Sequence, residues 1–328
     1  MGVASHCFRA QFGVYLRQRC RVSSLIEAVD LTKQFDDLVA VDGLTFTVNE
    51  GEILALLGPN GAGKTTTVRM LSSILKPTAG YARIAGYDVA QNPRAVRHLV
   101  GHLTEFPGLY LRMRPFEYLE FFGELHGMSH ENSHARTEEL MKQFEIWDAR
   151  ARRLGEYSKG MRQKMALIRA MLHNPRVLFL DEPTSAMDPH SAKQVRDAIA
   201  TLRGSGHTII LCTHNLYEAE TLADHIAIIR RGKLIAYGAP LELKREFLGL
   251  PLWQVQLAKP LNQPWFPLMN GNLKIESQDA LTATYRTESP EIANPALLHR
   301  LHDMGADVLA LREISRSLED VYLKLVEG

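Results

Sequence analysis

Apolar runs of strand length divide the first 240 residues into alternating strands and helices. Residues 44–57 (LTFTVNEGEILALL) are strand-like on either side of a turn at Asn49–Gly51. The continuous apolar run at 176–182 (RVLFLDE) predicts a strand buried on both faces. Further strands are expected at 24–35, 207–214 and 225–232, with a strand pair at 81–89. Strands that alternate with helices favour a parallel sheet wrapped by helices.

Helical periodicity predicts the segments between these strands. Helices are expected at 65–75, 115–127, 134–147, 161–173, 191–203 and 215–223. The first of them is stopped by residues 76–80 (KPTAG), because Pro77 and Gly80 interrupt a helix. Residues from about 107 to 170 are so rich in helix that they form an insertion in the α/β core.

The composition changes near residues 248–264, where several prolines and two tryptophans occur together. We therefore expect a main domain at 25–248 and a small α+β accessory domain at 249–328. Strands of this domain are expected at 253–258, 273–277, 281–286 and 307–313, with a helix at 295–304. A last helix opens at Ser317, with Asp320 as its capping partner.

Charge and cysteine content exclude several classes of protein. The 328 residues hold 38 Lys+Arg against 37 Asp+Glu, which argues against a surface built for nucleic acid. Three scattered cysteines do not form a disulfide framework. No apolar run approaches the roughly 20 residues that span a bilayer. Residues 1–24 are basic and lack a signal-peptide core, so we expect a disordered extension or a misassigned start; a basic arm that touches anionic lipid or a partner is the alternative.

Residues 58–65 (GPNGAGKT) match the phosphate-binding pattern G-x-x-x-x-G-K-[ST], between a predicted strand and a helix. Glycines let backbone N–H groups turn toward phosphate oxygens, and the helix that follows directs its positive end at the same anion. Lys64 reaches the β- and γ-phosphates, and the Thr65 hydroxyl suits Mg²⁺. The expected nucleotide-binding residues of this loop are Gly58, Pro59, Asn60, Gly61, Ala62, Gly63, Lys64, Thr65 and Thr66.

Two carboxylates end the buried strand at 176–182. Asp181 is predicted to hold Mg²⁺ directly or through water. Glu182 is expected to face the other way and to deprotonate the water that attacks the γ-phosphate. Separate duties for adjacent carboxylates indicate hydrolysis of the nucleotide rather than binding alone.

Histidines occur in two settings. His214 follows a strand that ends at the same sheet edge as the phosphate loop, so we predict a γ-phosphate contact. The spacing of His126, His130 and His134 invites a metal site, but residues 127–129 break a single helix there. We interpret these three histidines as solvated.

The order of these motifs resembles the ATP-binding cassette ATPases over about residues 25–240. The segments that carry the resemblance are GPNGAGKT, YSKGMRQ (157–163), LFLDEPTSAMDP (178–189) and the strand that ends in THN. The resemblance implies a P-loop NTPase (RecA-like) core with an antiparallel β subdomain and a helical subdomain. It also implies two cassettes that sandwich two ATP molecules, so the chain is expected to work as a dimer of itself.

The same resemblance implies roles for residues outside the phosphate loop. Phe35 corresponds to the aromatic side chain that stacks on adenine. Ser158 and Gly160, at the start of a helix, correspond to the signature loop that contacts the ATP of the other subunit. Asp188 lies in the loop that crosses to that subunit, and His214 corresponds to the switch histidine.

Two positions depart from the family pattern. Glu105 stands where a glutamine is usual; a carboxylate there can still ligate Mg²⁺, with a modest change expected in Mg²⁺ and ATP affinity. Lys159 replaces a signature glycine. We expect the Lys159 side chain to point into solvent or across the interface between the two subunits of the dimer.

The sequence also resembles the daunorubicin-resistance-type ATPase subunits, through YSKGM, PGLY (107–110) and the tail SLEDVYLKLVEG. That resemblance implies export through a separate transmembrane permease and a peripheral, cytoplasmic position on the inner face of the membrane. Arg112, Arg114, Phe116 and Tyr118 are candidates for permease contact, or else an ordinary helix start. The alternative is a soluble cassette ATPase acting on ribosomes or DNA, although the chain has one P-loop and no long basic face. A GTPase or kinase leaves YSKGM and SAMD unexplained.

Overall fold

The computed structural model describes residues 24–104, 108–185, 187–261 and 273–327. The chain divides into two compact units, Met1–Pro240 and Leu241–Gly328. No helix in the described part of the chain has the length and apolarity needed to cross a membrane.

A six-stranded sheet forms the centre of the first unit, in the order β10-β9-β3-β8-β7-β6. Its members are β3 (Ile53–Leu57), β6 (Val100–Leu103), β7 (Val177–Asp181), β8 (Thr208–Thr213), β9 (His225–Arg230) and β10 (Lys233–Gly238). All neighbours are parallel except β9 and β10. Strands β3, β7 and β8 are buried at every residue, because one helix and a second sheet pack on one face and helices on the other.

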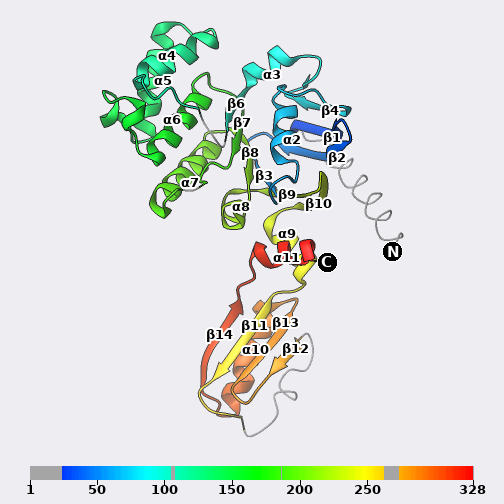
Figure 1. Cartoon of the computed structure of the whole chain (residues 1–328). Helices are drawn as coiled ribbons and strands as arrows, with labels where there is room; N and C mark the ends of the chain where they lie inside the picture. The colour runs from blue at the N-terminus through cyan, green and yellow to red at the C-terminus, as the bar shows by residue number, and fades with distance from the viewer. Residues whose placement is uncertain (1–23, 105–107, 186, 262–272, 328) are drawn as a thin grey trace. The chain divides into compact units, whose positions relative to one another are not determined.

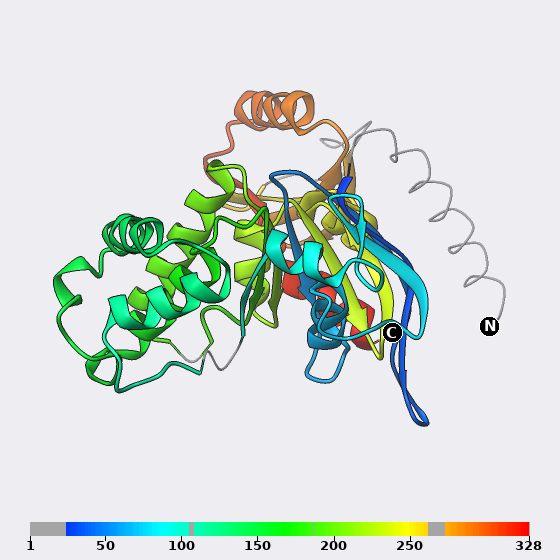
Figure 2. The ribbon, with the colours of Figure 1, turned by 90° about the horizontal axis from the view of Figure 1, so that it is seen from above.

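A second, antiparallel sheet has the order β2-β1-β4-β5. It comprises β1 (Ser24–Phe35), β2 (Leu38–Asn49), β4 (Ala79–Ile84) and β5 (Tyr87–Asp88), so the strand pair expected at 81–89 is present. Within this unit, Figures 1 and 2 show this sheet on one side of the central sheet and the helices α4, α5 and α6 on the other.

The helices of the first unit follow the predicted order with shifted ends. They are α2 (Lys64–Leu71), α3 (Pro93–Leu99), α4 (Pro115–Leu125), α5 (His130–Gln143), α6 (Lys159–Met171), α7 (Pro189–Gly204) and α8 (Leu216–Leu222). Helix α5 starts earlier than predicted because the Ser129 hydroxyl accepts the N–H of Asn132 and caps it. Helix α3 and strand β6 were not expected, although Pro93 after Asn92 is a helix-start signal.

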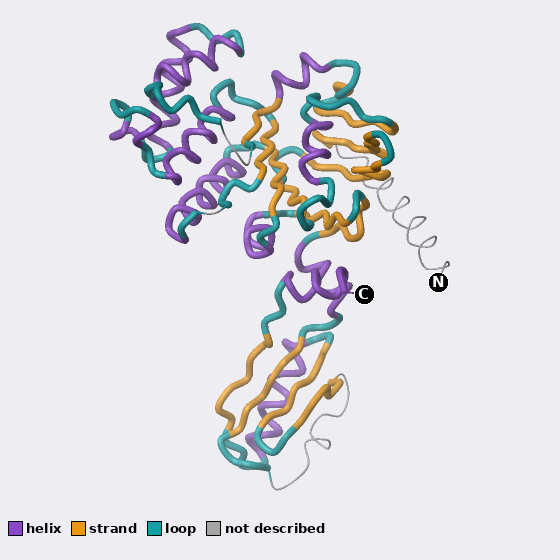
Figure 3. The backbone as a smooth tube through the Cα atoms, in the orientation of Figure 1, coloured by secondary structure: helices purple, strands orange, loops and turns teal. Residues whose placement is uncertain are grey.

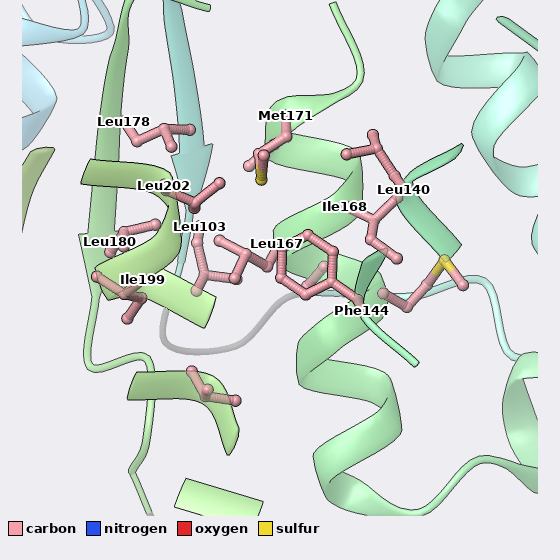
Figure 4. Packing of buried hydrophobic residues seen from close by; sticks show 14 of the residues in the cluster. Leu103, Leu140, Phe144, Leu167, Ile168, Met171, Leu178, Leu180, Ile199 and Leu202 are labelled. Atoms are coloured by element: carbon pink, nitrogen blue, oxygen red, sulfur yellow. The ribbon is translucent and has the colours of Figure 1, made fainter. Parts of the chain in front are cut away.

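Apolar packing joins the helical insertion to the central sheet. Figure 4 shows side chains from β6 and β7 meeting those of α6 and α7. The labelled residues Leu103, Leu140, Phe144, Leu167, Ile168, Met171, Leu178, Leu180, Ile199 and Leu202 belong to one buried cluster. This cluster fixes α6, and therefore the segment 157–163 at its start, to the strand that carries Asp181.

The second unit is an α+β fold with four antiparallel strands in the order β12-β13-β11-β14. Its elements are α9 (Pro240–Leu248), β11 (Leu252–Leu257), β12 (Leu273–Gln278), β13 (Thr282–Thr287), α10 (Pro290–Asp303), β14 (Val308–Ile314) and α11 (Leu318–Glu327). Figure 3 shows α10 lying along one face of these strands. Helix α10 begins five residues before the expected helix and contains Pro295. The predicted cap of α11 is confirmed by the Asp320 N–H, which donates to the Ser317 hydroxyl.

Candidate nucleotide site

The phosphate loop connects β3 to α2, as the sequence predicted, and two of its glycines are required by packing. A Cβ on Gly58 would lie 2.2 Å from the carbonyl oxygen of Ile229. Gly63 has a φ of 108°, and a Cβ there would lie 2.6 Å from the carbonyl oxygen of Ala40. Both positions therefore exclude every side chain, because the loop packs closely against the backbones of β9 and β2.

Lys64 lies inside this loop. Its Nζ donates to the carbonyl oxygens of Gly58 at 2.6 Å and Pro59 at 3.2 Å, and only 7% of the residue is exposed. The loop therefore wraps around a positive charge, which suits a polyphosphate. Pro59, Asn60 and Gly61 are exposed, Ala62 is buried and Thr66 is half-buried.

Thr65 and Asp181 come together from positions far apart in the chain. The Thr65 hydroxyl donates to Asp181 Oδ2 at 3.0 Å, and Asp181 is 6% exposed. A hydroxyl and a carboxylate at the end of a phosphate loop form an oxygen donor set of the kind that Mg²⁺ prefers. The donor set therefore fits the cation. Glu105, the third predicted ligand, lies outside the described residues.

Glu182 and His214 face each other across neighbouring strand ends. His214 Nδ1 lies 2.8 Å from Glu182 Oε1, and the Glu182 N–H donates to the carbonyl oxygen of Cys212 at 2.8 Å. Glu182 has a φ of 49°, a left-handed conformation that costs a non-glycine residue free energy. The parallel pairing of Leu57 with Thr213 brings this pair to the edge of the sheet at which the phosphate loop starts.

The segment 157–163 opens α6, and Ser158 is its N-cap: the Ser158 hydroxyl accepts the Met161 N–H at 3.2 Å. Gly160 packs on the start of α7, where an added Cβ would lie 2.9 Å from the Ser191 hydroxyl. A cavity of about 310 Å³ adjoins Ser158, Gly160, Lys164 and Ser191. Burial lowers the pKa of Lys164. The start of α6 therefore combines a helix N-terminus with a nearby cation.

The structure places the remaining predicted residues at the ends of other elements. Phe35 ends β1 with 42% of its surface exposed, and Lys33 Nζ lies 5.0 Å from its ring centroid. Asp188 is the N-cap of α7 and accepts the Ser191 N–H at 3.0 Å. Hydrogen bonds from the side chain and then the backbone of Ser191 lower the pKa of Asp188. Lys159 is exposed in the first turn of α6.

Of the four candidates for contact with a permease, Tyr118 fits the alternative prediction, an ordinary helix start, and not the permease contact. It is wholly buried, and its hydroxyl accepts from Arg169 Nη1 at 2.7 Å, so its side chain packs inside the helical insertion. Phe116 is half-buried, with its ring centroid 4.4 Å from that of His134. Arg112 and Arg114 are exposed.

The sequence reading missed Glu218, a buried carboxylate beside the Glu182–His214 pair. It accepts from the hydroxyls of Thr184 and Thr213. The only signal was the pattern Asn215-x-x-Glu218, which predicts a helix cap and nothing more. Of the histidines first considered for a metal, His130 and His134 contact Glu120, and His126 stacks on His173 with ring centroids 3.8 Å apart. The described residues contain no group of three or more His, Cys, Asp or Glu arranged to hold a metal.

A phosphate loop, an Asp–Glu pair and a histidine on one edge of a parallel sheet define a P-loop nucleotide hydrolase. The ABC transporter family pattern matches residues 41–185. The chain is 35% identical to the daunorubicin/doxorubicin resistance ATP-binding protein DrrA of Streptomyces peucetius, over 92% of each chain. It is 32% identical to the bacitracin transport ATP-binding protein BcrA of Bacillus licheniformis, over 94% of this chain and 99% of that one.

Among solved structures, an ATP-binding subunit of an ABC transporter superposes with a TM-score of 0.63 at 30% identity. The superposition covers 69% of this chain and 94% of the other. The chain belongs to the ATP-binding proteins of the ABC transporter family. It binds ATP and is an ATPase.

Proposed function

We propose that this chain powers an export permease by binding and hydrolysing ATP as a pair of identical cassettes. Export is supported by the similarity to drug-resistance and bacitracin-transport ATP-binding proteins. In this proposal the chain lies on the cytoplasmic face of the cell membrane, where a separate transmembrane permease holds it. Arg112 and Arg114 are exposed and remain candidates for that contact, whereas Tyr118 contributes by packing.

The Glu182–His214 pair is the observation that carries the proposal. Lys64 and the backbone of residues 58–66 bind the phosphates, and Phe35 stacks on the adenine. Glu182 takes a proton from the attacking water, and His214 orients Glu182 and contacts the γ-phosphate. Thr65 and Asp181, with Glu105 as a third candidate, would hold Mg²⁺, which would supply positive charge beside the β- and γ-phosphates.

The second cassette completes each site in this proposal. Ser158 and Gly160 present the N-terminus of α6 to the γ-phosphate bound by the partner, and Asp188 lies in the loop that crosses to it. ATP therefore stabilises the closed pair, because the segment 157–163 contacts nucleotide only when the two cassettes meet.

Residues 249–328 are assigned to an accessory domain and residues 1–24 to a basic extension.

The test is Glu182→Gln in the full chain. It should keep ATP binding, lower kcat by about 10²- to 10⁴-fold because the base is lost, and accumulate an ATP-bound dimer in size-exclusion chromatography. Lys64→Ala is the matched control, since it should lose ATP affinity and form no dimer. Normal turnover by Glu182→Gln would remove Glu182 as the base, and turnover that is independent of protein concentration would argue against the pair. Co-purification with ribosomes instead of membranes would favour the alternative function.

A further inference from the structure

Glu218 is a carboxylate that the phosphate chemistry described above does not use. It lies on α8, is wholly buried, and accepts hydrogen bonds from the Thr213 hydroxyl at 2.7 Å and the Thr184 hydroxyl at 3.0 Å. A buried carboxylate is costly unless its oxygens are paired, so this arrangement must be held by the surrounding fold. Burial raises the pKa of Glu218, and the two hydroxyls oppose that rise.

The two threonines lie beside the two residues that face each other at the sheet edge. Thr213 immediately precedes His214, and Thr184 is two residues after Glu182. One carboxylate therefore ties together the two chain segments that carry the Glu182–His214 contact. These segments are 32 residues apart in the sequence. They also meet through the pairing of β7 with β8 and the hydrogen bond from the Glu182 N–H to the Cys212 carbonyl oxygen.

Helix capping does not explain the Glu218 side chain. In a capping box it would reach back to the N–H of Asn215, the N-cap of α8. That N–H instead donates to the Thr213 hydroxyl oxygen at 3.0 Å, and Asn215 Oδ1 accepts the Glu218 N–H at 3.2 Å. The carboxylate is thereby left to both threonine hydroxyls, and the backbone is restrained on both sides of His214.

The backbone strain at Glu182 indicates why the hydrogen bonds of Glu218 to Thr184 and Thr213 matter. Its left-handed φ of 49° persists only where neighbouring contacts over-determine it, and its partner His214 is exposed. We propose that Glu218 is a positioning residue. It holds Glu182 and His214 in the orientation that hydrolysis requires, and so sets the rate of hydrolysis without touching the nucleotide. This inference rests on the proposed roles of Glu182 and His214.

Neighbouring charges act on the pKa of Glu218 in opposite directions, in addition to the rise that burial causes. The charge of Glu182 raises the pKa of Glu218, and that of Arg196 on α7 lowers it. Arg196 also lies over the ring of Tyr217, 5.6 Å from its centroid, so the guanidinium is held beside the start of α8. The helix that follows β8 is thus restrained from α7 as well as from the strand ends.

The threonine hydroxyls provide the sharpest test, because they can be removed with little change of shape. In the full chain, Thr184→Val should lower kcat for ATP by roughly 5- to 50-fold, since it leaves a buried carboxylate oxygen unpaired. Thr184→Ser keeps the hydroxyl and should restore kcat to within about twofold. The dissociation constant for ATP, measured by calorimetry in EDTA, should stay within about twofold for both. Equal kcat values for the valine and serine variants would overturn the proposal.

A double-mutant cycle separates positioning from general stability. Glu218→Ala should lower kcat by roughly 10- to 100-fold. In a His214→Ala background it should lower kcat by less than about threefold, because the histidine that Glu218 positions is already absent. Glu220→Gln, two residues further along α8, is the control. An equal loss from Glu218→Ala in both backgrounds would mean a purely structural role and would overturn the proposal. If Glu218→Ala does not fold, the Thr184 pair decides.

The experiments separate failure of the positioning role of Glu218 from failure of the proposed function. If Glu182→Gln turns over normally, the assignment of the base fails, whatever Glu218 does. If Glu182→Gln is inactive while Thr184→Val and Glu218→Ala both retain normal kcat, only the positioning role is refuted.

Discussion

Gly160, in the first turn of α6, offers a prediction in which two physical effects oppose each other. Alanine has a higher helix propensity than glycine by about 1 kcal/mol in a helix interior, so propensity alone predicts that Gly160→Ala stabilises the protein. Packing predicts the reverse. The added Cβ would lie 2.9 Å from the Ser191 hydroxyl oxygen and 3.0 Å from the Ser191 Cβ.

The distances decide between these effects. The Ser191 hydroxyl can rotate away, but its Cβ is fixed to the first turn of α7, so the two helices must separate by a few tenths of an ångström. Overpacking of this kind costs about 1–3 kcal/mol, and the propensity gain in a first turn is smaller than in an interior. We expect a net loss of about 1 kcal/mol, which lowers the Tm of a unit of this size by about 2–4 °C.

Gly204 is the matched control, because it is also a helical glycine but a Cβ added there meets nothing within 4 Å. Gly204→Ala should therefore stabilise the fold by about 0.4–1 kcal/mol. Both variants are compared by urea and thermal unfolding. In a Ser191→Gly background, Gly160→Ala should lose its penalty. An increase in Tm for Gly160→Ala that matches that of Gly204→Ala would refute the packing argument.

Two further predictions concern polar side chains of the first unit, one half-buried and one buried. Burial, together with the charge of His126, lowers the pKa of His173 from 6.5 to about 4. The unfolded chain therefore binds the proton more readily, and the free energy of unfolding should fall as the pH drops from 6.5 toward 4. His173→Asn should make that fall shallower when thermal unfolding is compared at pH 7 and pH 5. Tyr118→Phe removes the acceptor of an Arg169 N–H, so the free energy of unfolding in urea should fall by about 1–2 kcal/mol while the ATP affinity stays unchanged. A fall of less than about 0.3 kcal/mol would mean that water replaces the hydroxyl.

Contiguous sequence determined the local chemistry of this protein. The residues that the phosphate loop needs are consecutive, and so are Asp181 and Glu182, because a strand–loop–helix unit places neighbouring residues on one anion. The cap of α11 by Ser317 and Asp320 was predictable for the same reason, since its partners are three residues apart. Helix ends were less predictable, because a single side chain such as Ser129 moves a helix start by several residues.

Tertiary structure alone decided which distant groups meet. Thr65 and Asp181 are 116 residues apart. Their motifs predicted both as Mg²⁺ ligands, but the hydrogen bond between them depends on the pairing of buried strands, which no local pattern specifies. For Tyr118 the sequence left both permease contact and an ordinary helix start open; the side chain is buried, because the fold directs that face of α4 at Arg169. Glu218 has the spacing of a helix cap, and only the packing of α8 against β8 turns its carboxylate to Thr184 and Thr213. Sequence fixes what each residue can do over a few positions, whereas burial and strand order determine the partner with which it does so.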